Sequence, residues 1–307
     1  MFAYGQTGSG KTFTVSGIEK FVARGLLDGT LNGKRQIRIC IFELAGNQAS
    51  GKKCLSRPPA FLSNHMLDLL NNRKPISIME DSVKEIQLVG ATESEITTVE
   101  EIDDLIEKAT SLRRTAPTEK NDQSSRSHAI CRIRILNPES PSTPDGILYL
   151  IDLAGSEAAR DIAAHDASRM KETREINTSL SVLKDCIRGR AQLDAGLSKK
   201  KPFMPFRQSA LTKALKHVFD PESLRACRTS VIACVNPSYL DVGPSKNTLR
   251  YAEMLRVAIP KSDGLKPDPE IPRTWTNEMT REWITKNVSC ISFLLFLLSL
   301  YSRLWPC

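Results

Sequence analysis

The sequence predicts an α/β protein in which helices cover both faces of a central, mostly parallel β-sheet. Two observations lead to this prediction: a phosphate-binding loop near the N-terminus, and strand-like and helix-like segments that alternate along the rest of the chain. A phosphate-binding loop lies between a strand and a helix, and strands that alternate with helices form sheets covered by helices on each side. The predicted fold class is therefore a three-layer nucleoside-triphosphate-binding fold.

The loop at residues 5–12 reads GQTGSGKT and matches the pattern G-x-x-x-x-G-K-[ST] in full. Lys11 can reach the β and γ phosphates, and the Thr12 hydroxyl can ligate Mg²⁺. Residues 1–4 supply only the end of the strand that must precede such a loop, so we expect the chain to begin inside a domain and to lack its N-terminal strands. The predicted nucleotide-binding residues are Gly5, Gln6, Thr7, Gly8, Ser9, Gly10, Lys11 and Thr12.

The remaining elements follow from hydrophobic periodicity. Alternating patterns predict strands at 36–44 and 129–136. Nearly continuous apolar runs at 146–153 and 229–235 predict strands that are buried on both faces. Helix-like patterns occur at 100–114, 167–190, 208–219 and 244–257.

Composition and charge narrow the class of protein. Apolar residues make up 40% of the chain and charged residues 25%, which is typical of a soluble protein with a substantial core. The net charge of +8 and the pI near 9.1 favour an acidic partner: nucleic acid, an anionic membrane or an acidic protein surface. The eight cysteines form no C-x-x-C pair and no zinc spacing, and no N-terminal signal peptide is present. These features indicate reduced core cysteines in a cytosolic or nuclear protein.

Two further motifs specify the kind of nucleotide-binding protein. Residues 152–157 (DLAGSE) follow a strand, where an acidic residue can hold a Mg²⁺-bound water and a glycine N–H can sense the γ-phosphate. Residues 121–128 (NDQSSRSH) are rich in hydroxyls and precede a strand. Each motif alone is a weak signal. Together with the phosphate loop, and in this order, they closely resemble the kinesin motor family, in which these two strings are the switch motifs.

The resemblance continues beyond the switch motifs and covers about residues 1–258. It includes the strings EINTSL at 175–180, PFRQSALT at 205–212 and NTLRYA at 247–252. It implies a kinesin motor fold that binds ATP and Mg²⁺, hydrolyses the nucleotide, and binds tubulin and microtubules.

The resemblance also implies a role for each matching residue. Thr12 and Ser125 would ligate Mg²⁺, and Asp152 would act through a water. Asn121 and Ser124 would orient the γ-phosphate and the attacking water. The N–H of Gly155 would register the γ-phosphate. Arg126 would pair with Glu157, which would help to relay a proton from the water. His128 is at least as well explained as a structural histidine.

Within the family, residues 184–186 (KDC) resemble a tripeptide of the kinesin-13 class, on the helix that faces tubulin. Residues 50–52 and 67–71 resemble that class as well. Kinesin-13 proteins remove tubulin from microtubule ends instead of walking. The alternative is an unspecialised, motile kinesin in which these three residues are a solvated charge pair and a core cysteine.

The predicted tubulin-binding surface consists mainly of cations that would face acidic tubulin. At two positions, Thr178 and Ala210, the chain departs from the lysine that is usual in the family, and we expect this to lower affinity for the track. The predicted contact residues are Lys184, Asp185, Cys186, Arg188, Lys199, Lys200, Lys201, Arg207 and Lys213.

The C-terminal region divides into three parts. Residues 259–274 are a Pro-rich linker. Residues 275–287 are a helix with a Thr cap and an apolar face of Trp275, Met279 and Trp283; it resembles the first helix of a sterile-alpha-motif domain, with an ordinary docking helix as the alternative. Residues 288–307 are an apolar tail that is short for a membrane span. We interpret it as a translated intron or a frame error, with a tail anchor as the alternative.

We therefore expect an ATP-dependent, kinesin-13-like motor protein of cytoplasmic microtubules, with the spindle as one possible place of action. Expected partners are tubulin and microtubules, and a second copy of the chain through regions outside this sequence. No nucleic acid and no membrane is expected as a partner. The alternatives are a catalytically impaired microtubule-binding module, a conventional motile kinesin and a membrane-tethered nucleoside triphosphatase.

Overall fold

The computed structural model describes residues 1–28, 35–45, 66–82, 85–114, 123–140, 144–156, 167–196, 202–223, 227–256, 268–270, 272 and 275–287. The chain divides into two compact units, residues 1–257 and 258–307. Each unit is described by itself.

A mixed β-sheet forms the centre of the first unit. Its strand order is β10-β1-β9-β8-β2-β3-β4, with β7 also paired to β2. The strands are β1 (Phe2–Tyr4), β2 (Gln36–Ala45), β3 (Met66–Asp68), β4 (Lys74–Pro75), β7 (Ser94–Ile96), β8 (Ser127–Leu136), β9 (Gly146–Asp152) and β10 (Val231–Ala233). A separate antiparallel hairpin consists of β5 (Ser77–Glu80) and β6 (Ile86–Val89).

The α/β class is confirmed, but the prediction of a mostly parallel sheet was wrong. Among the described strands, β1 runs parallel to both β10 and β9, and the other pairs in the sheet are antiparallel. For β8 and β9 the connection explains the antiparallel pairing: the nine residues 137–145 between them are too few for the helical crossover that a parallel pair needs.

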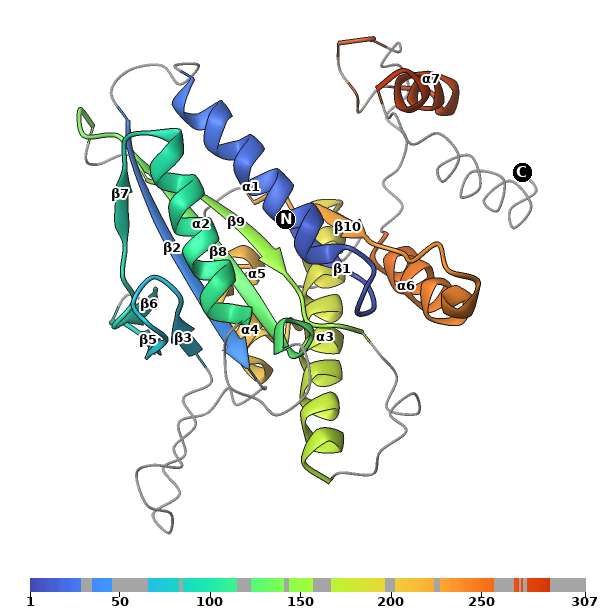
Figure 1. Ribbon diagram of the computed structural model, residues 1–307, viewed down its shortest axis with the longest axis horizontal. Coiled ribbons are helices and arrows are strands. Elements are labelled where there is room, and N and C mark those ends of the chain that lie inside the picture. The colour runs from blue at the N-terminus through green and yellow to red at the C-terminus, as the bar shows by residue number, and fades with distance from the viewer. Residues whose placement is uncertain are drawn as a thin grey trace. The chain divides into compact units, whose positions relative to one another are not determined.

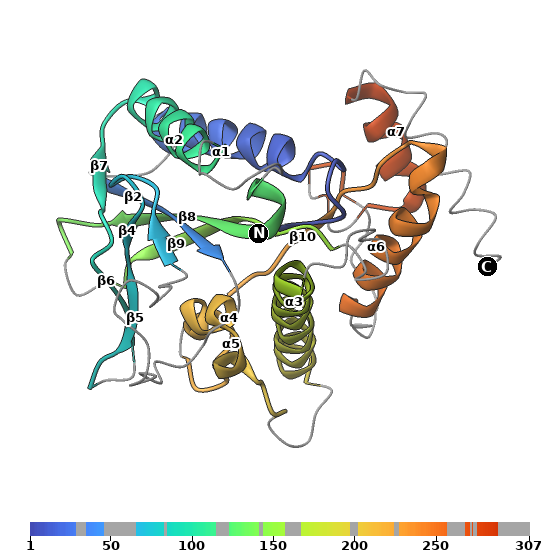
Figure 2. The same cartoon turned by 60° about the horizontal axis from the view of Figure 1, so that its bottom comes forward.

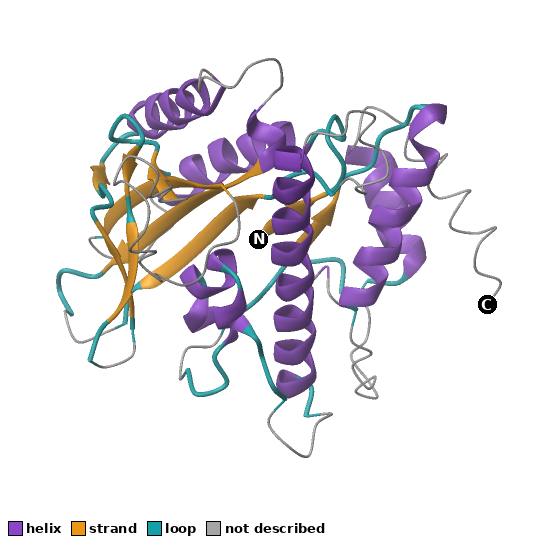
Figure 3. Ribbon diagram, turned by 90° about the horizontal axis from the view of Figure 1, so that it is seen from below, coloured by secondary structure: helices purple, strands orange, loops and turns teal. Residues whose placement is uncertain are grey.

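Helices cover both faces of this sheet, as Figures 1 and 2 show. One face carries α1 (Lys11–Leu27) and α2 (Val99–Arg114). The opposite face carries α3 (Ala167–Asp194), α4 (Ala210–Ala214) and α5 (Lys216–Phe219), with α6 (Val242–Leu255) packed beside α3. In Figure 3 the strands form one continuous layer among the helices, which gives the predicted three layers.

Alternation along β2 builds a core on each face of the sheet. Ile39 and Ile41 belong to the cluster that includes residues of α1 and α2. Phe42 and Leu44 belong to the cluster that includes residues of α3 to α6. Successive side chains of a strand point to opposite faces, so one strand contributes to both cores.

A capping box fixes the start of α2. The Thr98 hydroxyl accepts from the N–H of Glu101 at 3.2 Å, and the Glu101 carboxylate accepts from the N–H groups of Thr97 and Thr98 at 2.7 and 3.1 Å. These backbone hydrogen bonds lower the pKa of Glu101. They satisfy donors that a helix N-terminus leaves unpaired, and so fix the start of α2 at Val99. This is within one residue of the predicted start.

The structure differs from the sequence prediction in two places. Residues 208–219 are not one helix: α4 and α5 are separated at Leu215, whose φ and ψ are −102° and 22°. The apolar runs at 146–153 and 229–235 are less buried than predicted. Only the last three residues of β9 are buried, and β10 is half-buried throughout.

In the second unit, α7 (Asn277–Asn287) has the predicted cap, because the Thr276 hydroxyl accepts from the N–H of Met279 at 3.3 Å. Trp275 and Trp283 lie on one face of this segment, with ring centroids 5.9 Å apart. A sterile-alpha-motif domain stays a prediction, and residues 288–307 lie outside the described residues. Among the helices that the structure describes, none has the length and apolarity needed to cross a bilayer.

The two-faced core makes a stability prediction. Phe42 is completely buried, whereas Phe203 is 83% exposed. Phe42→Ala should lower the free energy of unfolding by about 3–5 kcal/mol, because it leaves a cavity in the central sheet. Phe203→Ala, the matched control, should change it by less than about 0.5 kcal/mol. Urea denaturation measures both values, and equal effects would contradict this description of the core.

Candidate functional site

The phosphate-binding loop connects β1 to α1 with a backbone that requires glycine. Gly8 and Gly10 have φ of 76° and 84°, which other residues rarely adopt. At Gly5, a Cβ atom would lie 2.2 Å from the carbonyl oxygen of Cys234, so no larger residue fits. The N-terminus of α1 therefore faces the loop and offers N–H groups and a positive dipole to an anion.

Lys11, the first residue of α1, lies at this loop. Its side chain is buried, and Nζ donates a hydrogen bond of 2.8 Å to the carbonyl oxygen of Gln6. The ammonium group is thus held over the loop by the loop's own backbone. A phosphate bound there would meet a cation that is already in place.

The three residues predicted to hold Mg²⁺, two as ligands and Asp152 through a water, lie together. Thr12, Ser125 and Asp152 line one cavity of about 320 Å³ that also includes residues of α1, α2 and β8. The Thr12 hydroxyl donates to Asp152 Oδ2 at 2.7 Å. Asp152 Oδ1 is buried and has no hydrogen-bond partner, which is costly unless a cation or its water fills the position. Two hydroxyls beside such a carboxylate suit Mg²⁺, so these residues fit the metal.

Arg113 is a site residue that sequence reasoning missed. Its Nη1 donates to Asp152 Oδ2 at 2.6 Å and its Nη2 to the carbonyl oxygen of Ser127 at 2.7 Å. The side chains of Arg113 and Asp152 are only 5% and 4% exposed. A signal was available, because Arg113 continues the buried stripe Ile102, Ile106 and Ala109 of α2. A cation in an apolar stripe indicates a buried partner.

The two switch segments meet at the phosphate loop. The N–H of Gly155 donates to the carbonyl oxygen of Ser125 at 2.7 Å, and that of Ser156 to the carbonyl oxygen of Gly5 at 3.1 Å. The N–H of Gly155, predicted to register the γ-phosphate, thus has a partner in the other switch. Arg126 ends the short helix η2 (Gln123–Arg126) and is half-buried. Asn121, Glu157 and the side chain of Ser124 lie outside the described part of the chain.

His128 is a structural residue. Its Nδ1 accepts from the N–H of Ala154 at 3.0 Å, which leaves the proton of the neutral ring on Nε2, 2.8 Å from the Ser179 hydroxyl. Ser179 donates in turn to the carbonyl oxygen of Ile176 at 2.7 Å. Burial, followed by the charges of Arg113 and Lys11, lowers the pKa of His128 to about 3. The imidazole is therefore neutral at physiological pH.

Glu19 is an unpredicted acid at the same cavity. It lies on α1 and is nearly buried. Burial, followed by the negative charge of Asp152, raises the pKa of Glu19 to about 7. The cavity behind the phosphate loop thus contains a carboxyl group that is partly protonated near neutral pH.

The predicted tubulin-binding residues divide into three groups. Lys184, Asp185 and Arg188 lie on α3, with Asp185 exposed and both cations half-buried. Arg207, 61% exposed, pairs with Glu80 of β5 at 3.1 Å, and Lys213 of α4 is half-buried. Residues 199–201, the three lysines, lie outside the described residues.

Two surface assignments were wrong. Cys186 has no exposed surface and packs in the core beneath α3, where burial raises the pKa of its thiol to about 12. It therefore cannot contact a partner. Ala210 is also buried, at 4% exposure, so the missing lysine there is not a lost surface cation. Thr178 is exposed, as predicted.

A family model described as "Kinesin motor domain" matches residues 1–257. The chain belongs to the kinesin motor family. It is 37% identical over 267 residues to "Diatom spindle kinesin-1" of Cylindrotheca fusiformis, an alignment that covers 86% of this chain and 38% of that protein. It is 34% identical over 276 residues to "Kinesin-like protein KIN-13B" of Arabidopsis thaliana, covering 87% of this chain and 36% of that protein. The kinesin chain thus spans less than two fifths of the length of these two relatives.

A solved structure gives the same result. A kinesin structure described as showing, through mutants, a signalling pathway for activation of the kinesin motor ATPase has a TM-score of 0.60 and 28% identity to this chain. The similarity covers 83% of this chain and 72% of that structure. Kinesin motor domains bind nucleotide, typically with Mg²⁺, and bind microtubules, which agrees with the cavity at Thr12 and Asp152.

The neutral state of His128 makes a prediction about pH. Its pKa in the folded protein, about 3, is below its ordinary value of 6.5, so its contribution to stability is fully present above pH 6.5 and decreases as pH falls toward 3. The difference in unfolding free energy between wild type and His128→Gln should therefore shrink by roughly 2–3 kcal/mol between pH 6.5 and 4.5.

Urea denaturation of both proteins at several pH values measures this difference. Glu19 has the opposite dependence, because its raised pKa favours the folded state at lower pH. Glu19 is the same in both proteins, so its effect cancels in the comparison. A difference that does not vary with pH would show that the pKa of His128 in the folded protein is the same as in the unfolded chain, which would contradict this description of the residue.

Proposed function

We propose that this kinesin domain hydrolyses ATP and couples hydrolysis to binding of tubulin. The observation that supports this most directly is the unpartnered Oδ1 of Asp152, beside the Thr12 hydroxyl at the end of a complete phosphate-binding loop. When bound, Mg²⁺ would neutralise charge on the β and γ phosphates. Thr12 and Ser125 would hold the metal, and Asp152 would hold one of its waters.

Positioning and charge neutralisation account for most of the proposed catalysis. Lys11 and the loop N–H groups would bind the phosphates. Gly155 would report the γ-phosphate by exchanging its hydrogen bond with Ser125 for one to the nucleotide. Asn121 and Ser124 are proposed to orient the attacking water. Arg126 is proposed to pair with Glu157, which would relay a proton from that water.

Two variants separate binding from turnover. Lys11→Ala should weaken ATP binding by roughly tenfold or more, because it removes a charge-assisted contact to the phosphates. Glu157→Ala should leave binding intact and lower kcat by roughly 10²-fold or more, the usual contribution of proton transfer. Lys20→Ala, an exposed lysine on the same helix as Lys11, is the control.

The measurements are the dissociation constant of a fluorescent ATP analogue and the steady-state rate of phosphate release, with and without microtubules. Any longer form of the protein that contains these residues serves equally well. Equal turnover by wild type and Glu157→Ala would contradict the assigned mechanism. Wild-type binding of microtubules without turnover would favour the alternative, a binding module without catalysis.

We further propose a kinesin-13-like activity, in which ATP hydrolysis drives removal of tubulin from microtubule ends. The KDC sequence at residues 184–186 and the similarity to KIN-13B support this proposal. Because Cys186 is buried, only Lys184 and Asp185 of this tripeptide can reach tubulin. The alternative is a conventional motile kinesin. Either function would place the protein on cytoplasmic microtubules, including the spindle.

The class can be tested with a surface variant. Lys184→Ala combined with Asp185→Ala should slow ATP-dependent release of tubulin from stabilised microtubules several-fold and change basal ATP turnover by less than about twofold. Lys20→Ala lies on the opposite face of the sheet and should change neither rate. A sedimentation assay measures the release. Directed gliding of microtubules without shortening would instead identify a conventional kinesin.

A further inference from the structure

Glu43 is a charged residue inside the central sheet. It lies on β2, opposite Ala129 of β8 and Leu67 of β3, and its side chain has no exposed surface. Burial of a carboxylate is costly unless it is paired and hydrogen-bonded. Glu43 Oε1 accepts a hydrogen bond of 2.5 Å from the Ser127 hydroxyl. Oε2 accepts no hydrogen bond from the described residues but forms an ion pair with Arg73 Nη1 at 2.6 Å.

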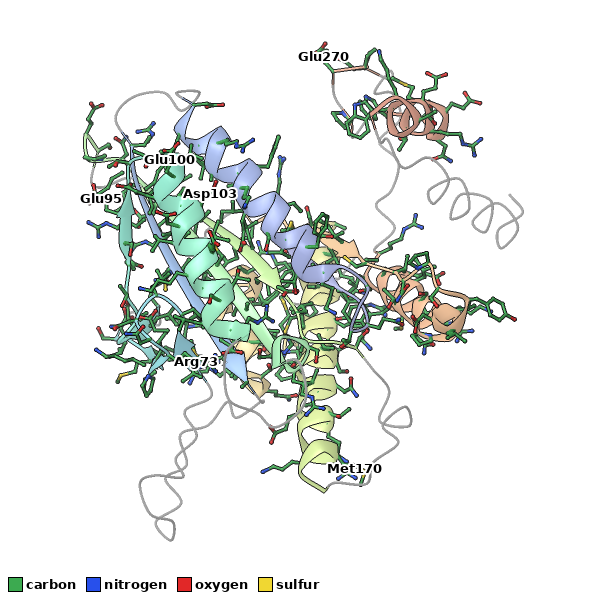
Figure 4. The ribbon with its side chains drawn as sticks, in the orientation of Figure 1. Arg73, Glu95, Glu100, Asp103, Met170 and Glu270 are labelled. Carbon is green, nitrogen blue, oxygen red and sulfur yellow. The ribbon has the colours of Figure 1, made fainter. Side chains whose placement is uncertain are left out.

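Arg73 belongs to a constrained turn between β3 and β4. Asn72 and Arg73 have φ of 48° and 59°, a left-handed conformation that costs about 1–2 kcal/mol per residue. The N–H of Arg73 donates to the carbonyl oxygen of Asp68 at 2.8 Å, and Nη1 donates to that of Leu112 in α2 at 3.3 Å. Figure 4 labels Arg73 near the carboxyl ends of β2 and α2. The contact with Glu43 therefore helps to hold the turn in this conformation.

On its other side, Glu43 connects to the nucleotide site. Ser127 directly follows η2, which carries the candidate metal ligand Ser125. The Ser127 carbonyl oxygen accepts from Arg113, which pairs with Asp152. The polar chain Arg73–Glu43–Ser127–Arg113–Asp152–Thr12 is continuous, with successive polar atoms 2.5–2.7 Å apart.

The turn at Arg73 leads into the predicted partner surface. Four residues after Arg73, β5 begins, and its last residue, Glu80, binds Lys216 at 2.8 Å and Arg207 at 3.1 Å. Arg207 is a predicted tubulin contact. The hairpin β5–β6 is thus connected to the nucleotide site at one end and to the predicted tubulin-binding surface at the other.

We propose that Glu43 is a positioning residue that couples the nucleotide site to the hairpin β5–β6 through its buried contacts with Ser127 and Arg73. The proposal rests on the proposed function, because the coupled states are nucleotide binding and tubulin binding. Coupling between two sites typically changes affinity or stimulation 5- to 150-fold. Removal of Glu43 or Arg73 should therefore reduce stimulation of the ATPase by microtubules.

A double-mutant cycle of Glu43→Gln, Arg73→Gln and the double variant tests the coupling. Gln at position 43 still accepts from Ser127 but lacks the charge that faces Arg73. Each single variant should bind ATP and turn it over without microtubules within about twofold of wild type, and should lose roughly fivefold or more of the microtubule stimulation. The double variant should lose no more than either single one, because both remove the same contact.

Two controls separate coupling from folding. Arg132→Gln breaks an ion pair with Glu93 that is outside the polar chain, and it should keep full stimulation. The side chains of Arg132 and Arg73 are 13% and 19% exposed, so the two arginines are similarly buried. Arg73→Lys keeps the charge and should restore part of the stimulation. Should Glu43→Gln fail to fold in a thermal melt, the two Arg73 variants and the control still decide the question, because Arg73 lies at a partly exposed turn.

Hydrogen exchange gives a readout that does not need catalysis. In wild type, Mg²⁺ and ADP should change amide exchange in residues 77–89, and in Arg73→Gln this change should be lost. A wild type that binds no nucleotide overturns the proposed function and the coupling together. If microtubules stimulate the wild type, and Arg73→Gln shows the same stimulation and the same change in amide exchange, the coupling is overturned. The proposed function is not affected by that result.

Discussion

The register between the parallel strands β1 and β9 is the constraint on which the site depends. Phe2 lies opposite Ile151, and Ala3 lies opposite Asp152. Parallel neighbours end at the same edge of a sheet, so the phosphate loop after β1 and the carboxylate at the end of β9 arrive together. The hydrogen bond between Thr12 and Asp152 follows from this register. A shift by one residue would turn Asp152 to the opposite face of the sheet, among the apolar residues beneath α3.

Around this register, the domain buries charges that stability alone does not explain. Arg113 and Asp152 are almost fully buried, as is Glu43. Replacing a buried ion pair with apolar residues is often neutral or stabilising, so such pairs are weak evidence of stabilisation. Arg113 and Glu43 both contact Ser127, the last residue of a segment from Ser125 to Ser127 that carries a candidate metal ligand. Asp152 pairs with Arg113. Their geometry fixes that segment relative to the phosphate loop.

Local patterns were enough to predict the phosphate loop, the long strands and most of the helices. The resemblance to kinesins placed Thr12 near Asp152, and the structure shows that the parallel pairing of β1 with β9 brings them together. The polar chain could not be predicted. Glu43 and Ser127 are 84 residues apart, and only the pairing of β2 with β8 brings them together. A single acid in an apolar strand signals a buried partner, but the sequence does not indicate which residue that partner is.

The helical period of α3 indicates that Cys186 is buried, but the prediction of a contact surface followed the resemblance to kinesin-13 instead. Leu183 and Ile187 are buried, and Cys186, three residues after the first and one before the second, lies on the same face. Assigning residues 184–186 to a contact surface as one unit ignored that period, because three consecutive residues span most of a helical turn. Lys184 and Asp185 can meet a partner, whereas Cys186 can act only through packing against the sheet. If all three residues contribute to one function, Lys184 and Asp185 do so by contact with a partner and Cys186 by the packing of α3 against the sheet.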